Sequence, residues 1–238
     1  MSHLWVFVES LADSSLVTLA PDESRHVSAR RLRIGDGVVA FDGRGRTADA
    51  IVEGIGRRGV EIRLGVSTLQ APPADRFVLA TVIPKGERLA TMLPMLVQLG
   101  VSTWQPLVLD DSAVRDLDVC SDRIQRILIE SAKVARRPWS LEVRPPCGLE
   151  AVLAGRPVAG RVCFGAREGG DVGLPREAEV CLIGPEAGFS AAELARLAAA
   201  GARACALGSH NLRIETAAVA AAVARFVARG AGGRGSDG

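Results

Sequence analysis

The 238-residue sequence lacks the features typical of membrane, secreted and zinc-binding proteins. No apolar stretch reaches the roughly 18 uninterrupted residues that a membrane helix needs, and its start has no basic segment followed by an apolar one, as a signal peptide would. Its five cysteines include no CxxC pair, and with three histidines they form no recurring ligand spacing. We therefore expect no membrane segment, no metal, a cytoplasmic location, and reduced, mostly buried thiols.

Net charge is almost absent as well, since 29 Lys and Arg residues against 27 Asp and Glu residues give +2. The average surface is therefore not polycationic, and any surface that binds nucleic acid must be a local patch. Lysine is scarce, because Lys85 and Lys133 are the only two, and every other basic side chain is arginine. A biased genome composition produces such a preference, but arginine also suits phosphate recognition and base stacking better than lysine.

What is present up to residue 70 is a series of short strands separated by glycine turns. The strands are predicted at 38–42, 48–53 and 60–64. The glycines between them supply the positive φ that tight hairpins need, and a short helix is predicted from Pro21 towards Arg31. Residues 1–70 are predicted to form a small β-barrel or sheet domain, and 71–75, with two consecutive prolines, a stiff linker.

From residue 76 to 230, apolar strands alternate with helices, and this alternation implies an α/β domain with a parallel sheet covered by helices. The strands are predicted at 77–83, 101–109, 162–164, 180–183 and 203–207. The helices are predicted at 86–99, 121–137, 190–201 and 214–228. Gly100 is expected to end the first helix, and Ser190 with Glu193 to form a capping box. The tail, 231–238, is predicted to be disordered.

Two glycine-rich loops, 182–190 and 207–213, each lead from a strand of this sheet into a helix. Ligands of parallel sheets collect outside the carboxyl ends of the strands, and free N–H groups at helix starts face the same crevice. Each loop alone is a weak signal, because such turns are mostly structural. Neither loop fits the Walker or the Rossmann pattern, so no nucleotide site of those kinds is predicted.

Together and in this order, the two loops resemble the signature of the RsmE family of ribosomal RNA methyltransferases, within the SPOUT superfamily. The matching residues are Ile183-Gly184-Pro185-Glu186-Ala187-Gly188-Phe189-Ser190-x-x-Glu193 and Leu207-Gly208-x-x-x-Leu212-Arg213-Ile214-Glu215-Thr216-Ala217. Earlier segments give supporting matches, namely Arg25-His26-Val27-x-x-x-Arg31-Leu32-Arg33-x-Gly35-Asp36 and Lys85-Gly86-x-Arg88.

The resemblance implies a fold, a cofactor and an activity. The fold would be an N-terminal PUA-like β-barrel domain followed by a C-terminal SPOUT-type α/β domain with a trefoil knot. The cofactor would be S-adenosylmethionine, bound in a homodimer with the site near the subunit interface. The activity would be methylation of N3 of a uridine in 16S ribosomal RNA of the small subunit.

The two loops hold the candidate cofactor-binding and catalytic residues. Those expected to bind the cofactor are Leu182, Ile183, Gly184, Glu186, Gly188, Leu207, Gly208, Leu212 and Thr216. Arg213 is expected to hold a phosphate or the charge developing on the uracil. Glu186 is expected to position the substrate or accept the N3 proton, with capping of the next helix as an equal alternative. Glu215 is interpreted as orienting Arg213 rather than as a base.

Two arginine-rich clusters are candidates for contacting the RNA backbone. The first contains Arg25, Arg30, Arg31 and Arg33, and the second, before Pro138, contains Arg123, Arg126, Lys133, Arg136 and Arg137. A charged helix face is usually only solvated, so that alternative stays open. Trp104, inside a predicted strand, is expected in the core, whereas Trp139 could equally stack on bases.

Several positions depart from the family pattern and define a second hypothesis. Ala187 stands where the family usually has a glycine, Asn211 and Ile214 replace residues that are usually aliphatic and threonine, and Lys133-Val134 replaces a glutamate–glutamine pair. The alternative is a dimeric RNA-binding SPOUT protein that is non-catalytic or has altered specificity. The target nucleotide, the proton acceptor, and the choice between free RNA and an assembled subunit as substrate remain open at this point.

Overall fold

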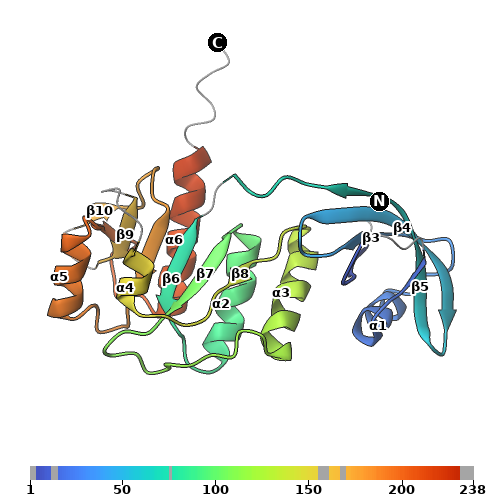
Figure 1. Ribbon diagram of the computed structural model, residues 1–238, viewed down its shortest axis with the longest axis horizontal. Helices are drawn as coiled ribbons and strands as arrows, with labels where there is room; N and C mark the ends of the chain where they lie inside the picture. Colours follow the sequence, from blue (N-terminus) through green and yellow to red (C-terminus); the bar gives the residue numbers. More distant parts are fainter. Residues whose placement is uncertain (1–3, 12–15, 75–76, 155–160, 167–169, 231–238) are drawn as a thin grey trace, which may run out of the picture. The chain divides into compact units, whose positions relative to one another are not determined.

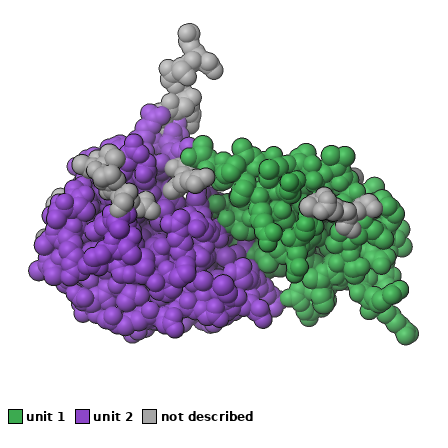
Figure 2. Space-filling model, in the orientation of Figure 1, with its two compact units in different colours: residues 1–74, 129–140 green, residues 75–128, 141–238 purple. Residues whose placement is uncertain are grey.

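The computed structural model describes all residues except 1–3, 12–15, 75–76, 155–160, 167–169 and 231–238. The chain forms two compact units, coloured separately in Figure 2. Unit 1 consists of residues 1–74 and 129–140, and unit 2 of residues 75–128 and 141–238. The tail predicted to be disordered lies outside the described residues.

Unit 1 is built on a five-stranded sheet with the strand order β1-β3-β4-β5-β2 (Figure 1). The strands are β1 (Leu4–Phe7), β2 (Leu16–Thr18), β3 (Gly37–Phe41), β4 (Arg46–Gly56) and β5 (Gly59–Leu69). Neighbouring strands pair antiparallel except β1 with β3. Along β4, Ala48, Ala50 and Val52 are buried and alternate with exposed side chains, so one face of the sheet covers the core. The three predicted strands are confirmed; β1 and β2 were not predicted.

Helix α1 (Pro21–Ala29) begins at a proline, as predicted, and carries Asp22 and Glu23 in its first turn, where carboxylates are favourable. Ser24 fixes the helix against the sheet. Its buried hydroxyl accepts a hydrogen bond from the N–H of Val60 at 3.0 Å and donates one to the carbonyl of Leu19 at 3.1 Å. The predicted helix is thereby confirmed, although it ends near Ala29 rather than Arg31.

Trp139 packs on the turn between β3 and β4 within unit 1. The N–H of Gly45 donates to the carbonyl of Pro138 at 2.9 Å, and the indole Nε1 of Trp139 donates to the carbonyl of Gln70 at 3.2 Å. A Cβ on Gly45 would overlap the indole ring itself. The sequence left open whether Trp139 packs in the fold or stacks on bases. Its indole is half-buried and packs within unit 1.

Replacing Gly45 with alanine should destabilise unit 1 more than the same change at Gly35. Both glycines have a φ of +93°, so both alanines carry the cost of a left-handed backbone, about 1 to 2 kcal/mol. Only Gly45→Ala also collides with Trp139, whereas a Cβ on Gly35 meets no atom within 4 Å. We expect Gly45→Ala to cost about 2 kcal/mol more, measured by urea unfolding. Equal losses for the two variants would contradict the packing described for Trp139.

Unit 2 is built on a seven-stranded sheet with the order β10-β12-β9-β11-β6-β7-β8 (Figure 1). Its strands are β6 (Val78–Val82), β7 (Thr103–Leu107), β8 (Glu142–Val143), β9 (Val162–Gly165), β10 (Asp171–Val172), β11 (Val180–Ile183) and β12 (Arg203–Ala206). Every strand pairing described in this sheet is parallel, as predicted. The two-residue strands β8 and β10 are too short to show a hydrophobic period, and they were not predicted.

The helices that follow β6 in the chain are α2 (Glu87–Gln98), α3 (Asp122–Ala135), α4 (Leu149–Leu153), α5 (Ala191–Ala199) and α6 (Ile214–Gly230). Helix α6 packs on α2 and on strands β6 and β11. Gly100, at a φ of +78°, follows the end of α2 as predicted. The capping box at the start of α5 is also confirmed, and the side chain of Glu193 additionally accepts the N–H of Asp110 at 3.0 Å.

The interior of the unit 2 sheet is apolar, and Trp104 in β7 is fully buried, as predicted. Its indole N–H donates to the hydroxyl of Thr81 at 3.0 Å, so the buried polar group is satisfied. Among the described residues, no helix is both long enough and apolar enough to cross a membrane.

Candidate functional site

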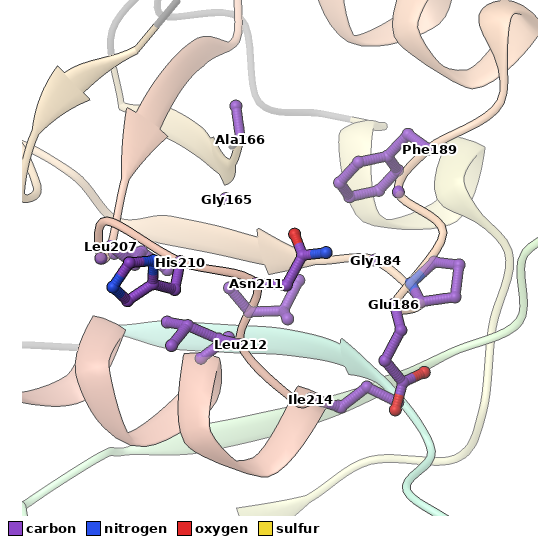
Figure 3. A pocket seen from close by; sticks show the side chains of 15 residues that line it. Gly165, Ala166, Gly184, Glu186, Phe189, Leu207, His210, Asn211, Leu212 and Ile214 are labelled. Atoms are coloured by element: carbon purple, nitrogen blue, oxygen red, sulfur yellow. The ribbon is translucent and has the colours of Figure 1, made fainter. Parts of the chain in front are cut away.

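A cleft opens where the carboxyl ends of β9, β11 and β12 meet (Figure 3). The strand order places β9 between the other two strands, so the loops that follow all three converge. The cleft holds about 610 Å³ of empty space, including its solvent-facing mouth. Its lining residues are Gly165, Ala166, Ile183, Gly184, Pro185, Glu186, Gly188, Phe189, Leu207, Gly208, His210, Asn211, Leu212, Ile214 and Ala217.

The structure brings most of the predicted loop residues together at this cleft. Those that line it are Ile183, Gly184, Glu186, Gly188, Leu207, Gly208 and Leu212. Leu182 does not line it: its side chain is fully buried in β11, and successive strand residues point to opposite faces. Thr216 and Arg213, at the start of α6, are exposed and also lie outside the lining. No side-chain partner of Arg213 is found in the described part of the chain.

Sequence reasoning missed the part of the cleft that follows β9, namely Gly165 and Ala166, and did not propose Phe189 or His210 as lining residues. A signal for the first two existed, because the strand before them was predicted and its carboxyl end belongs to the same edge of the sheet. Figure 3 shows His210 beside Leu207, whereas Glu186 lies next to Ile214 at another part of the cleft.

Three glycines keep the floor of the cleft bare. A Cβ on Gly184 would lie 3.1 Å from the ring of Phe189, one on Gly208 would lie 3.3 Å from Leu212, and one on Gly165 would lie 3.2 Å from Ile183. A side chain at any of these positions would fill the space that the neighbouring apolar groups leave. The floor is therefore backbone and aliphatic carbon, which suits a flat ring with polar edges.

The departure at Ala187 fits this geometry. Gly188 has a φ of +89°, a conformation that favours glycine, whereas Ala187 is not among the described residues with positive φ. The side chain of Ala187 is also exposed. A glycine is therefore not required at Ala187.

A charged cluster occupies the rim of the cleft. Arg88, from α2, donates through Nη1 to Oε1 of Glu186 at 3.1 Å, and the same Nη1 lies 3.9 Å from Oε2 of Glu215. Because α6 packs on α2, Glu215 faces Arg88. The interpretation that Glu215 orients Arg213 is therefore wrong: the cation beside Glu215 is Arg88, and the side chain of Arg213 is exposed.

Three cysteines form a layer beneath the cleft. Cys163, Cys181 and Cys205 are buried, and each lies two residues before a lining residue of its own strand or loop. The hydrogen bond with the Cys181 thiol, and burial, raise the pKa of Cys163, and contact with Cys163, and burial, raise that of Cys205. The thiols of Cys163 and Cys205 are therefore neutral. Cys147 is half-buried and Cys120 is exposed.

No group of three or more His, Cys, Asp or Glu side chains that could hold a metal ion occurs in the described part of the chain. The thiol layer beneath the cleft thus serves as apolar packing under the floor.

Of the predicted RNA-contacting arginines, Arg123 and Arg126 belong to unit 2 and the others to unit 1. Those that are exposed are Arg25, Arg30, Arg31, Arg33, Arg123, Arg126 and Arg136. Arg25 forms an ion pair with Asp22, one turn away on α1. Arg137 is half-buried, and desolvation lowers the pKa of its guanidinium.

The prediction that the second basic cluster contacts RNA is wrong for Lys133. Its ammonium is buried and lies 2.7 Å from Oε1 of Glu23 and 2.6 Å from Oε1 of Glu130. A lysine that is buried between two carboxylates does not offer its charge to an RNA phosphate. The mistake arose because the sequence shows the helix but not the carboxylate of α1 that covers this position.

Comparison with known proteins identifies the family. A family model described as an RNA methyltransferase domain matches residues 71–225, and one described as an RNA methyltransferase PUA domain matches residues 19–65. The chain belongs to this RNA methyltransferase family. The resemblance to the RsmE family is confirmed, as is the predicted order of a PUA-like β domain and a SPOUT-type α/β domain.

Relatives of this RNA methyltransferase cover nearly the whole chain. Ribosomal RNA small subunit methyltransferase E of Rickettsia conorii is 26% identical, over 93% of this chain and 94% of its own length. The protein of the same name from Mycobacterium bovis is 29% identical, over 93% of this chain and 90% of its own length.

Two solved structures share the fold. A ribosomal RNA small subunit methyltransferase E from Neisseria gonorrhoeae, bound to S-adenosyl methionine, has a TM-score of 0.82 at 23% identity and covers 95% of this chain and 98% of its own. A probable rRNA-methyltransferase from Porphyromonas gingivalis has a TM-score of 0.83 at 24% identity, with coverages of 96% and 99%.

Proposed function

We propose that this RNA methyltransferase transfers a methyl group from S-adenosylmethionine to N3 of a uridine in 16S ribosomal RNA of the small subunit. The observation that carries the proposal is the glycine-floored cleft, because the two loops with the family signature form most of its lining. The relatives named as small subunit methyltransferases support the choice of substrate, and the Neisseria structure with S-adenosyl methionine supports the choice of cofactor.

The residues of the cleft fit this cofactor. Ile183, Leu207 and Leu212 supply apolar surface for an adenine ring, and the bare backbone at Gly184 and Gly208 leaves amides for its polar edge. When bound, S-adenosylmethionine supplies a methyl group on a positively charged sulfur, which is already electrophilic. The protein then has to align the two reactants and remove the N3 proton.

For the target base we propose separate tasks for Glu186 and Arg213. The carboxylate of Glu186 lines the cleft and is half exposed, so it can accept the N3 proton of the uridine. Arg213 is the last residue of the 207–213 loop, and its exposed guanidinium can hold a phosphate or the charge on the uracil ring. The arginines on the surface of unit 1 would contact the RNA backbone.

We also propose that the chain works as a homodimer. Helix α6 carries an exposed apolar stripe, Val223, Phe226 and Val227, whose side chains are 42%, 69% and 59% exposed. Large apolar side chains that are exposed at helical spacing mark an interaction surface. The side of α6 opposite its buried alanines is therefore the candidate dimer contact.

The test uses small subunits from a strain that lacks the gene. They are incubated with the purified protein and methyl-labelled S-adenosylmethionine, and the nucleosides of the 16S RNA are then separated by mass spectrometry. We expect labelled 3-methyluridine. Label on another nucleoside would replace the proposed target with a different base. RNA binding without label would favour the non-catalytic alternative that the substitutions at Asn211 and Ile214, both in the cleft, keep open.

A further inference from the structure

Arg88 lies outside both signature loops, yet it contacts the rim that they form. It is the second residue of α2, and 98 residues of sequence separate it from Glu186. Its guanidinium contacts the loop after β11 through Glu186, and the first turn of α6 through Glu215. One side chain from a third segment thus joins the two segments that close the cleft.

The second carboxylate shows why this arginine matters. The side chain of Glu215 is 12% exposed, and its Oε2 is the buried side-chain polar atom that has no hydrogen-bond donor in the described part of the chain. A buried carboxylate oxygen without a donor carries a desolvation penalty. The guanidinium of Arg88 lies 3.9 Å from this oxygen, too far for a hydrogen bond but within ion-pair range, and its positive charge compensates the carboxylate.

The two carboxylates compete for one cation. Glu186 is 50% exposed, so water screens its charge, whereas Glu215 is almost withdrawn from water. Without Arg88, Glu215 would remain as a buried negative charge near a second one, and Glu186 would lose the donor that fixes its rotamer. Like charges repel, so the rim would open and the Glu186 carboxylate would turn to solvent.

We propose that Arg88 is a positioning residue of the methyl-transfer site, which holds the Glu186 carboxylate at the rim of the cleft while compensating Glu215. The inference rests on the proposed function, since it concerns the residue through which the uridine would be positioned. Arginine is suited to the task because its planar fork carries five donors and reaches two carboxylates at once, which an ammonium does less well.

A double-mutant cycle tests this role. Arg88→Met removes the charge and keeps the aliphatic stem, Glu186→Gln removes the partner charge, and the double variant closes the cycle. Each protein is assayed for kcat, for KM of the RNA, and for the Kd of S-adenosylhomocysteine. We expect Arg88→Met to lower kcat roughly tenfold or more, with a smaller change in KM, because the carboxylate is misplaced. In the Glu186→Gln background, Arg88→Met should lower kcat about twofold at most.

Rescue and a matched control separate positioning from general stability. Arg88→Lys keeps the positive charge and should recover part of kcat. Arg196→Met is the control, because Arg196 of α5 forms a similarly exposed pair with Glu150 of α4, at 2.7 Å and away from the lining of the cleft. It should leave kcat unchanged. Glu186→Gln and Arg196→Met should melt within about 3 °C of the parent protein, as expected for pairs that water reaches. Arg88→Met also removes the cation beside the nearly buried Glu215 and should melt lower, so every kcat is measured well below the melting temperature.

The outcomes divide clearly. Additive losses for Arg88→Met and Glu186→Gln, or a wild-type kcat for Arg88→Met, would overturn the positioning role. If the parent protein transfers no methyl group, the proposed function fails separately, and the same cycle is read from the Kd of S-adenosylhomocysteine. A loss of affinity in Arg88→Met that disappears in the Glu186→Gln background supports the positioning role. A loss of affinity that is the same in both backgrounds overturns it.

Discussion

Replacing Lys133 with methionine is expected to lower the free energy of unfolding by about 3 to 5 kcal/mol. The ammonium of Lys133 and the carboxylate of Glu23 are 2.7 Å apart, with both side chains 5% exposed. The other oxygen of Glu23 accepts the backbone N–H of Phe7 at 3.2 Å, so this carboxylate is held between β1, α1 and the 129–140 segment. Methionine would leave it buried and charged without a cation, which urea unfolding would register as a lower midpoint.

Two companions to Lys133→Met show whether the buried pair is responsible. Glu130→Gln removes the other carboxylate beside Lys133, whose side chain is 46% exposed, and should cost less than about 1 kcal/mol. The double variant Lys133→Met with Glu23→Gln removes both buried charges and should regain much of the loss. A double variant as unstable as the sum of its single changes would mean that the two side chains do not act as a pair.

Valine in place of Gly184 is expected to weaken the binding of S-adenosylhomocysteine at least about a hundredfold, because the added carbons occupy space that a ligand needs. Its Cβ would already lie 3.1 to 3.3 Å from three ring atoms of Phe189, and the two methyl groups would extend into the cleft or force that ring aside. Titration calorimetry measures the affinity, and circular dichroism checks that the fold is retained.

Gly148→Val is the matched control for Gly184→Val. Gly148 precedes α4 in the same unit, has φ −76° and ψ 169°, and would place its Cβ at an ordinary 3.5 Å from Glu150. Valine adopts that extended backbone readily, so the affinity for S-adenosylhomocysteine should stay at the parent value. Unchanged affinity in Gly184→Val would exclude the glycine-floored cleft as the place where the cofactor binds.

The local patterns of the sequence predicted the elements of the fold well but not their neighbours in space. The capping box at Ser190, the glycine end of α2 and the alternation along β4 depend on residues close together in the chain, so periodicity and turn chemistry reveal them. The strand order places β11 beside β6, about a hundred residues away, and no period in the sequence reports that pairing. The trefoil knot stays a prediction of the resemblance.

The candidate site, too, was predicted only where its residues are neighbours in the sequence. The loops after β11 and β12 were predicted, because their glycines and helix starts are contiguous signals. Gly165 joins them only through the strand order, and Arg88 only through the packing of α2 on α6. Lys133 looked like one more surface cation, since the carboxylate that buries it lies 110 residues earlier. Long-range charge pairs of this kind leave no local pattern.

The division of unit 1 between residues 1–74 and 129–140 bears on how the protein emerges from the ribosome. After residue 74 has been made, translation has to reach residue 140 before Trp139 can cover Gly45 or Lys133 can neutralise Glu23. At ordinary synthesis rates that delay is about 3 to 13 seconds. Unit 1 is therefore begun first but can be completed only after part of unit 2 has been made, and an excised fragment of residues 1–74 would lack the cation that neutralises Glu23.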